Sequence, residues 1–149
     1  MSGSNKTMPN KPDWFYNEWQ QVGLDFEDQQ QVSDYDTRQG SDPDADQKLI
    51  EQLGIRPGQT LIDLGCGTGS FAIAAARHGA QVHAVDVSKT MLKHIERQCN
   101  HQNIQSVSLH HSGFLTYDHK GQADWIISRY AYAEGYFIGR SKCYETDAG

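Results

Sequence analysis

A glycine-rich segment holds the residues whose types and spacing best suit ligand binding. It reads Asp63-Leu-Gly65-Cys66-Gly67-Thr68-Gly69, with a short apolar stretch before it and an alanine-rich stretch after it. Glycine lets the backbone turn tightly and approach a ligand where a Cβ atom would collide. A glycine loop between a strand and a helix is typical of nucleotide-type sites. The sequence therefore predicts a ligand-binding loop over residues 65–69.

An acidic residue follows this loop at a distance that suits a ribose. Asp86 lies 21 residues after Gly65, at the expected carboxyl end of the next strand. A carboxylate there can accept hydrogen bonds from both ribose hydroxyls. In the alternative interpretation the glycines only close a tight turn and Asp86 only caps a helix. The combination of loop, acid, spacing and strand context weakens that alternative.

The spacing and the charge of the loop favour an adenosine ligand without a phosphate. The dinucleotide fingerprint requires a glycine at position 70, where Ser70 stands. Asp63, two residues before the first glycine, would repel a pyrophosphate and attract an ammonium group. S-adenosyl-L-methionine combines an adenosine with a cationic end, so we predict it as the cofactor. An NAD-dependent dehydrogenase is the less favoured alternative.

The elements that must position these residues alternate along the chain. Short apolar runs are expected to form strands over residues 60–64, 81–86, 106–110 and 123–128. Helices are expected over residues 43–53, 70–78 and 89–100. Asp42 and Ser88 are suitable N-caps for the first and third of these helices. Alternating strands and helices imply parallel pairing, so the predicted fold is α/β, a Rossmann-like doubly wound and mostly parallel sheet.

The large apolar side chains lie mainly in the middle of the chain. Of the 28 Leu, Ile, Val and Phe residues, 21 fall in residues 49–131, and residues 1–48 carry ten acids against four bases. We therefore expect a polar leader with a cap or lid segment over 1–42, a cofactor-binding Rossmann-like domain over 43–130, and an irregular tail over 131–149.

Charge and composition exclude several classes of partner. The formal net charge is −6, so no overall basic field favours nucleic acid or an anionic membrane. The longest unbroken apolar run, Phe71 to Ala76, is far too short to span a bilayer. The N-terminus does not lead into an apolar signal segment, and the three cysteines form no close-spaced motif. We expect a cytoplasmic protein with free thiols that binds neither nucleic acid nor membrane.

The seven histidines do not predict a metal site. His110 and His111 are adjacent on an expected strand, so their side chains should point to opposite faces and cannot easily share one ion. His111 can still lie near the mouth of the ligand site, because strand ends carry function in this architecture.

The segments IDLGCGTG (62–69) and VDVS (85–88) resemble motifs of the class I S-adenosylmethionine-dependent methyltransferase family. The similarity runs from about Tyr35 to Tyr130. It implies that the Gly65–Gly69 loop lines the methionine moiety and that Asp63 serves its amino group. It also implies that Asp86 holds the ribose and that Val87 packs against the adenine.

The later motifs of the family are matched less closely. Residues 111–115 correspond to the third motif, where many members carry an acid in place of Gly113; Phe114 can still pack on the adenine ring. Residues 123–130 correspond to the fourth, which places Ser128 toward the methyl group and substrate. Tyr35 resembles the N-terminal tyrosine that covers the cofactor, with an ordinary loop aromatic as the alternative. The predicted cofactor-binding set is Asp63, Gly65, Cys66, Gly67, Thr68, Gly69, Asp86, Val87, Phe114, Ser128 and Tyr35.

These observations lead to one preferred function and two alternatives. The preferred function is methyl transfer to an unidentified acceptor, expected to be a small molecule, and no residue identifies itself as a catalytic base. The alternatives are a truncated, non-catalytic module that binds the cofactor or a partner, and the NAD-dependent dehydrogenase. Residues 60–130 supply four of the family's seven strands. We therefore expect an incomplete sheet, weak activity and self-association through an exposed fourth strand.

Overall fold

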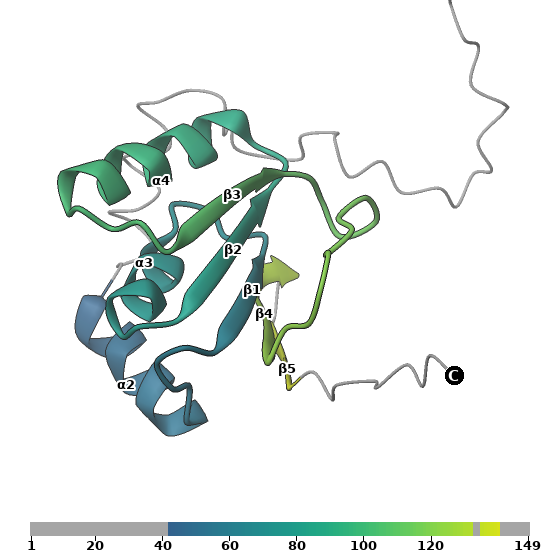
Figure 1. Ribbon diagram of the computed structural model, residues 1–149. Helices are drawn as coiled ribbons and strands as arrows, with labels where there is room; N and C mark the ends of the chain where they lie inside the picture. The colour runs from purple at the N-terminus through teal and green to yellow at the C-terminus, as the bar shows by residue number, and fades with distance from the viewer. Residues whose placement is uncertain (1–41, 133–134, 141–149) are drawn as a thin grey trace, which may run out of the picture.

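The structure is a computed structural model that describes residues 42–132 and 135–140 of the chain (Figure 1). Its helices are α2 (Pro43–Leu53), α3 (Ser70–Arg77) and α4 (Lys89–His101). Its strands are β1 (Thr60–Leu64), β2 (Gln81–Asp86), β3 (Val107–His111), β4 (Trp125–Tyr132) and β5 (Gly135–Arg140). Strands and helices alternate from β1 to β3, as the sequence predicts.

The strands form one sheet in the order β3-β2-β1-β4-β5. The β1 strand lies parallel to both β2 and β4, and β2 lies parallel to β3. The chain therefore extends the sheet in one direction from β1 to β3 and then crosses to the other side of β1. In such a sheet, ligands bind at the carboxyl ends of the strands where the direction reverses. The predicted α/β Rossmann-like fold is confirmed.

The fifth strand was not predicted. The expectation of irregular structure after residue 130 is wrong for Gly135–Arg140, which pair antiparallel with β4. A run of two aromatic residues and an isoleucine, Tyr136 to Ile138, suits a strand. Because β4 has β1 on one side and β5 on the other, the expectation that β4 forms an exposed edge is also wrong. Within the described residues the outer strands are β3 and β5.

The three helices pack on one face of the sheet (Figure 1). The main core joins their apolar side chains to those of the strands, and its largest fully buried members are Phe71, Ile50, Leu61, Ile95, Ile127 and Val82. Each helix begins or ends as the sequence indicates. The Asp42 side chain accepts a hydrogen bond from the Asp44 amide at the start of α2, and Ser88 accepts from the Met91 amide at the start of α4. None of the described helices is long and apolar enough to cross a membrane.

The loop between β3 and β4 covers part of the opposite face (Figure 1). Its Tyr117 packs against a second, smaller cluster that contains Ile62 and Val85. Beneath the same loop, His83 of β2 and His110 of β3 make a hydrogen bond between Nδ1 and Nε2 at 2.9 Å. His119 of the loop stacks edge-on against His83, with 4.8 Å between ring centroids. The loop between β3 and β4 therefore covers apolar side chains on this face of the sheet, as the three helices do on the other face.

Three hydrogen bonds tie the start of β4 to the start of β1. The Thr60 amide donates to Asp124 Oδ2 at 2.8 Å, and the Asp124 amide donates to the Thr60 carbonyl at 2.8 Å. The indole N–H of Trp125 donates to Gln59 Oε1 at 3.0 Å. These bonds set the register that brings the carboxyl ends of the two strands together.

Candidate functional site

The glycine loop follows β1 at the carboxyl edge of the sheet and is held against the end of β2. The amides of Gly65 and Cys66 both donate to the Val85 carbonyl, at 2.8 and 3.1 Å. The Gly69 amide closes the turn by donating to the Cys66 carbonyl at 3.0 Å. Thr68 is half-buried within this turn. Main-chain bonds therefore set the shape of the loop, which lies where the sequence places it.

Asp86 connects the loop to the end of β2. Its Oδ2 accepts a hydrogen bond from the Gly67 amide at 3.0 Å, and its Oδ1 accepts one from the Ser88 amide at 2.8 Å. These two bonds fix the orientation of both carboxylate oxygens at the end of β2. The predicted loop and the predicted acid are thus brought into direct contact.

Gly67 and Gly69 have different reasons to be glycine. Both have left-handed backbone, with φ of 57° and 81°. A Cβ atom on Gly67 would meet no described atom within 4 Å, whereas one on Gly69 would lie 2.5 Å from Ile95 Cγ1. Gly69 therefore lets α3 begin close to α4. Gly67 faces open space beside Asp86, which is the arrangement that a bound ligand requires.

The loop carries negative charge at its base. Asp63 is 3% exposed and lies at the end of β1, opposite Ala84 of β2 and Ile127 of β4. Burial, followed by the charges of Asp63 and Asp86, holds the pKa of the Cys66 thiol well above its usual range. The thiol is therefore protonated and unsuited to nucleophilic attack. The same two carboxylates favour a cationic group beside the loop.

Ser128 contributes an unsatisfied hydroxyl in the middle of β4, directly after the last residue of β4 that pairs with β1. Its side chain is 4% exposed, and its Oγ is the buried side-chain polar atom without a hydrogen-bond partner in the described part of the chain. An unpaired buried hydroxyl costs about 1–3 kcal/mol. Ser128 follows Ile127, which lies opposite Asp63 in the sheet, so this residue lies beside the end of β1, where the glycine loop begins. A ligand there would satisfy it.

The turn after β3 adds the expected adenine side of the site. Its Ser112 amide donates to the Asp86 carbonyl at 3.1 Å, which holds the turn beside the end of β2. Phe114 is 42% exposed on this turn. His111 Nε2 lies 2.9 Å from the Val87 carbonyl oxygen, which fits an N–H donor and fixes the Asp86–Ser88 segment. That contact was not predicted, although the sequence places His111 near the site mouth.

Asp46 is a second residue that was missed. This α2 carboxylate is 4% exposed, and its Oδ2 accepts a hydrogen bond from Ser70 Oγ at 2.7 Å, directly after the loop. The sequence holds a faint signal, because Asp46 precedes the buried Ile50 by one helical turn and so shares its inward face. Tyr35, in contrast, lies outside the described residues.

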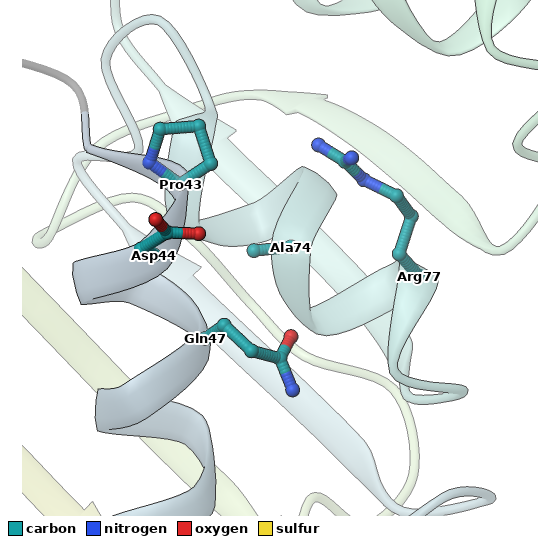
Figure 2. A pocket seen from close by; sticks show the side chains of 5 residues that line it. All are labelled: Pro43, Asp44, Gln47, Ala74 and Arg77. Atoms are coloured by element: carbon teal, nitrogen blue, oxygen red, sulfur yellow. The ribbon is translucent and has the colours of Figure 1, made fainter.

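Two other features of the structure lie apart from this site. A groove of about 200 Å³ runs between α2 and α3, lined by Pro43, Asp44, Gln47, Ala74 and Arg77 (Figure 2). None of the predicted cofactor residues lines it.

Across residues 42–132 and 135–140, no three His, Cys, Asp or Glu side chains are grouped so that they can hold a metal ion.

Comparison with known proteins gives this geometry a family. The family model described as a methyltransferase domain matches residues 61–137, just over half of the chain. The match begins in β1 and runs into β5, so it includes the glycine loop, Asp86 and Ser128. It excludes α2.

Individual relatives match a similar share of this chain. A 23S rRNA (uracil(1939)-C(5))-methyltransferase of Alcanivorax borkumensis is 32% identical over 81 residues, which are 54% of this chain and 18% of that protein. The structure of coclaurine N-methyltransferase bound to N-methylheliamine and SAH is 28% identical, with a TM-score of 0.52 over 56% of this chain and 25% of that one. Matched regions make up 15% to 26% of the curated relatives' lengths.

A third comparison concerns the fold alone. A Methanococcus maripaludis protein, solved as a candidate S-adenosyl-L-methionine-dependent methyltransferase, is 22% identical, and the similarity covers 75% of this chain and 54% of that one with a TM-score of 0.61. Sheet order, glycine loop, strand-end acid and family match all agree. The chain belongs to the class I S-adenosylmethionine-dependent methyltransferase family.

Proposed function

We propose that this chain binds S-adenosyl-L-methionine at the glycine loop and takes part in transfer of its methyl group. The observation that carries the proposal is the contact between Asp86 and the Gly67 amide, because it joins the loop and the strand-end acid into one cradle. Asp86 would accept hydrogen bonds from the ribose hydroxyls. Asp63 would attract the amino group of the cofactor's methionine part, and the open space at Gly67 would allow the cofactor to lie against the main chain of the loop.

The bound cofactor supplies a methyl group that its sulfonium already activates. The residues of the chain then have to hold the cofactor and orient it toward an acceptor, which is the part of catalysis that proximity provides. Ser128 Oγ, buried and without a partner in the described residues, would donate a hydrogen bond to a ligand beside the end of β1. A general base is needed only when the acceptor must lose a proton.

A small-molecule acceptor is our proposal for the substrate class. The net charge of −6 supports it, because an RNA acceptor is usually held by a basic surface. The coclaurine N-methyltransferase structure, a related fold, holds the small molecule N-methylheliamine together with SAH. The rRNA methyltransferase among the relatives is the counterexample that makes a direct test necessary.

Calorimetric titration tests cofactor binding. We expect S-adenosyl-L-methionine and its demethylated product to bind, and NAD not to bind, because Asp63 disfavours a pyrophosphate. Equal binding of NAD would favour the dehydrogenase alternative. Failure of both methionine compounds to bind would overturn the proposal.

Methyl transfer is tested separately with S-adenosyl-L-methionine labelled in its methyl group. Label should appear in small amines or phenols from a panel of acceptors rather than in ribosomal RNA. Label in the RNA alone would overturn the proposed acceptor class. Cofactor binding without transfer to any acceptor of the panel would favour the alternative of a non-catalytic binding module.

A further inference from the structure

A buried carboxylate outside the matched family region contacts the end of the glycine loop. Asp46 belongs to α2, which precedes the matched residues 61–137, and it is 4% exposed. Carboxylates are almost never buried to this extent unless they are paired. A charged group on the inward face of a helix also costs more than an apolar one. The position of Asp46 therefore calls for a specific explanation.

The partner of Asp46 is the first residue of α3. Ser70 Oγ donates to Asp46 Oδ2 at 2.7 Å, a short distance that is typical of a hydroxyl bound to a carboxylate. Ser70 directly follows Gly69, whose amide donates to the Cys66 carbonyl. Gly69 provides no side-chain cap for α3. The contact with Asp46 is thus a side-chain anchor at the point where the loop becomes a helix.

A second hydrogen bond joins the same two helices without reaching the loop. Gln47 Nε2 lies 3.3 Å from His78 Nδ1, beyond the last residue of α3. Figure 2 shows Gln47 projecting from α2 toward α3, in the groove that separates Asp44 from Arg77. The two bonds therefore connect opposite ends of α3 to α2. Only the Asp46 bond lies next to residues that would contact a cofactor.

We propose that Asp46 is a positioning residue which, through Ser70, sets the place where the Gly65–Gly69 loop ends. The inference rests on the proposed cofactor site. The first three residues of the loop are held by hydrogen bonds to Val85 and Asp86. The position of the other end, at Gly69, therefore determines whether the loop amides can contact the methionine part of the cofactor. The adenosine part is held separately by Asp86 and the turn after β3. Loss of the anchor should therefore weaken binding of the methionine part selectively.

Two ligands that differ only in the methionine part distinguish this role from a general structural one. S-adenosylhomocysteine carries the amino acid portion, and 5′-methylthioadenosine lacks it while keeping the adenosine and the sulfur. For Asp46→Ala we expect about tenfold weaker binding of S-adenosylhomocysteine, since the end of the loop loses its charge-assisted hydrogen bond to α2. Binding of 5′-methylthioadenosine should change less than about twofold. Asp46→Asn keeps an acceptor oxygen and should restore most of the affinity.

The matched control is Gln47→Ala, which removes the other α2–α3 hydrogen bond. It should lower the melting temperature without separating the two ligands. If Asp46→Ala does not fold, Ser70→Ala removes the same bond from its donor side and should give the same selective loss.

Equal loss of both ligands, or no loss of either, would overturn the inference. So would a selective loss in Gln47→Ala. Failure of the unmodified chain to bind S-adenosylhomocysteine would instead overturn the proposed function, which keeps the two failures distinct.

Discussion

Asp86 is the residue whose side chain connects most of the candidate site. Its two oxygens hold the Gly67 and Ser88 amides, and its carbonyl accepts from the Ser112 amide. The glycine loop, the start of α4 and the turn after β3 therefore meet at a single residue. A change at this position should affect ligand binding more than it affects the core, because the side chain lies at the edge of the sheet.

We expect Asp86→Ala to weaken binding of S-adenosylhomocysteine at least about tenfold. The two ribose hydroxyls would lose their charged acceptor, and each such hydrogen bond is worth about 1.5–3 kcal/mol. Titration calorimetry measures this effect. Asp124→Ala is the matched control, because Asp124 also accepts a main-chain amide but at the opposite end of the sheet. It should lower stability and leave affinity intact. An unchanged dissociation constant in Asp86→Ala would remove Asp86 from the site.

The Gly67→Ala variant should bind S-adenosylhomocysteine more weakly, because the alanine methyl group would occupy the open space beside Asp86 that the ligand is proposed to fill. The left-handed backbone adds a cost of about 1–2 kcal/mol to stability. Gly58→Ala has the same two properties, positive φ and no atom near the new Cβ, but lies in the turn before β1. The two variants should unfold at similar urea concentrations, and only Gly67→Ala should bind S-adenosylhomocysteine more weakly. Similar affinities would show that the space at Gly67 receives no ligand.

The residues that could be predicted from the sequence are those whose signals are local. Asp63, Gly67 and Asp86 stand at fixed offsets within one strand–loop–helix–strand unit, so spacing alone places them together. The Asp46–Ser70 contact was not predictable in this way. It joins residues 24 apart, and it depends on how α2 packs against α3, which no short pattern specifies.

At the scale of elements, the same distinction separates α3 and β2 from β5. The alanine-rich α3 lies between Gly69 and Gly79, and β2 begins two residues after Gly79; both elements were predicted within a residue of their observed ends. Gly135–Arg140 has glycine at two of its six positions, which weakens the strand pattern. Its pairing with β4 supplies what local propensity lacks, through the opposition of Ile127 and Ile138 along the ladder.

The loop between β3 and β4 should make stability depend on pH. Burial, together with His119 and His110, lowers the pKa of His83, and burial together with His119 lowers the pKa of His110. The unfolded chain therefore binds protons more readily than the folded one below the ordinary value of 6.5. The contribution of these two histidines to the free energy of unfolding should be full above pH 6.5. It should decrease as the pH falls from 6.5 through their lowered pKa values.

Urea unfolding at pH 7.5, 6.5 and 5.5 tests this expectation. The free energy of unfolding should fall across the series, and it should fall less in the double variant His83→Gln/His110→Gln. The hydrogen bond between His83 Nδ1 and His110 Nε2, at 2.9 Å, needs an unprotonated nitrogen as its acceptor. When both rings carry a positive charge, this bond is lost and the rings repel each other. Equal pH dependence in the two proteins would show that other groups are responsible.

At the scale of the whole molecule, the sheet ends in β3 and β5 within the described residues. An unpaired strand edge is a template for pairing with another chain. The expected self-association therefore concerns these strands, and β4 is excluded because it is paired on both sides.

Analytical ultracentrifugation should show an average mass that rises with concentration. Ser108→Lys places a charge on β3 at an exposed position and should shift this rise to higher concentration. Gln102→Lys adds the same charge at the exposed C-cap of α4, away from a strand edge, and should have no effect. A constant monomer mass, or equal behaviour of the two lysine variants, would contradict association through β3.

The placement of β4 beside β1 also bears on the order in which the protein assembles. The β3-β2-β1 half of the sheet comes from one continuous stretch, in which each strand is followed by its neighbour. Pairing of β1 with β4 joins residues more than 60 positions apart, as between Ile62 and Ile126, and long-range pairings form slowly because closing the intervening chain costs entropy. The loop and Asp86 belong wholly to the early half. In pulsed hydrogen exchange during refolding, the amides that join β1 to β2 should therefore gain protection before those of β4. Among the described residues proposed to bind the cofactor, Ser128 would be the last to reach its place.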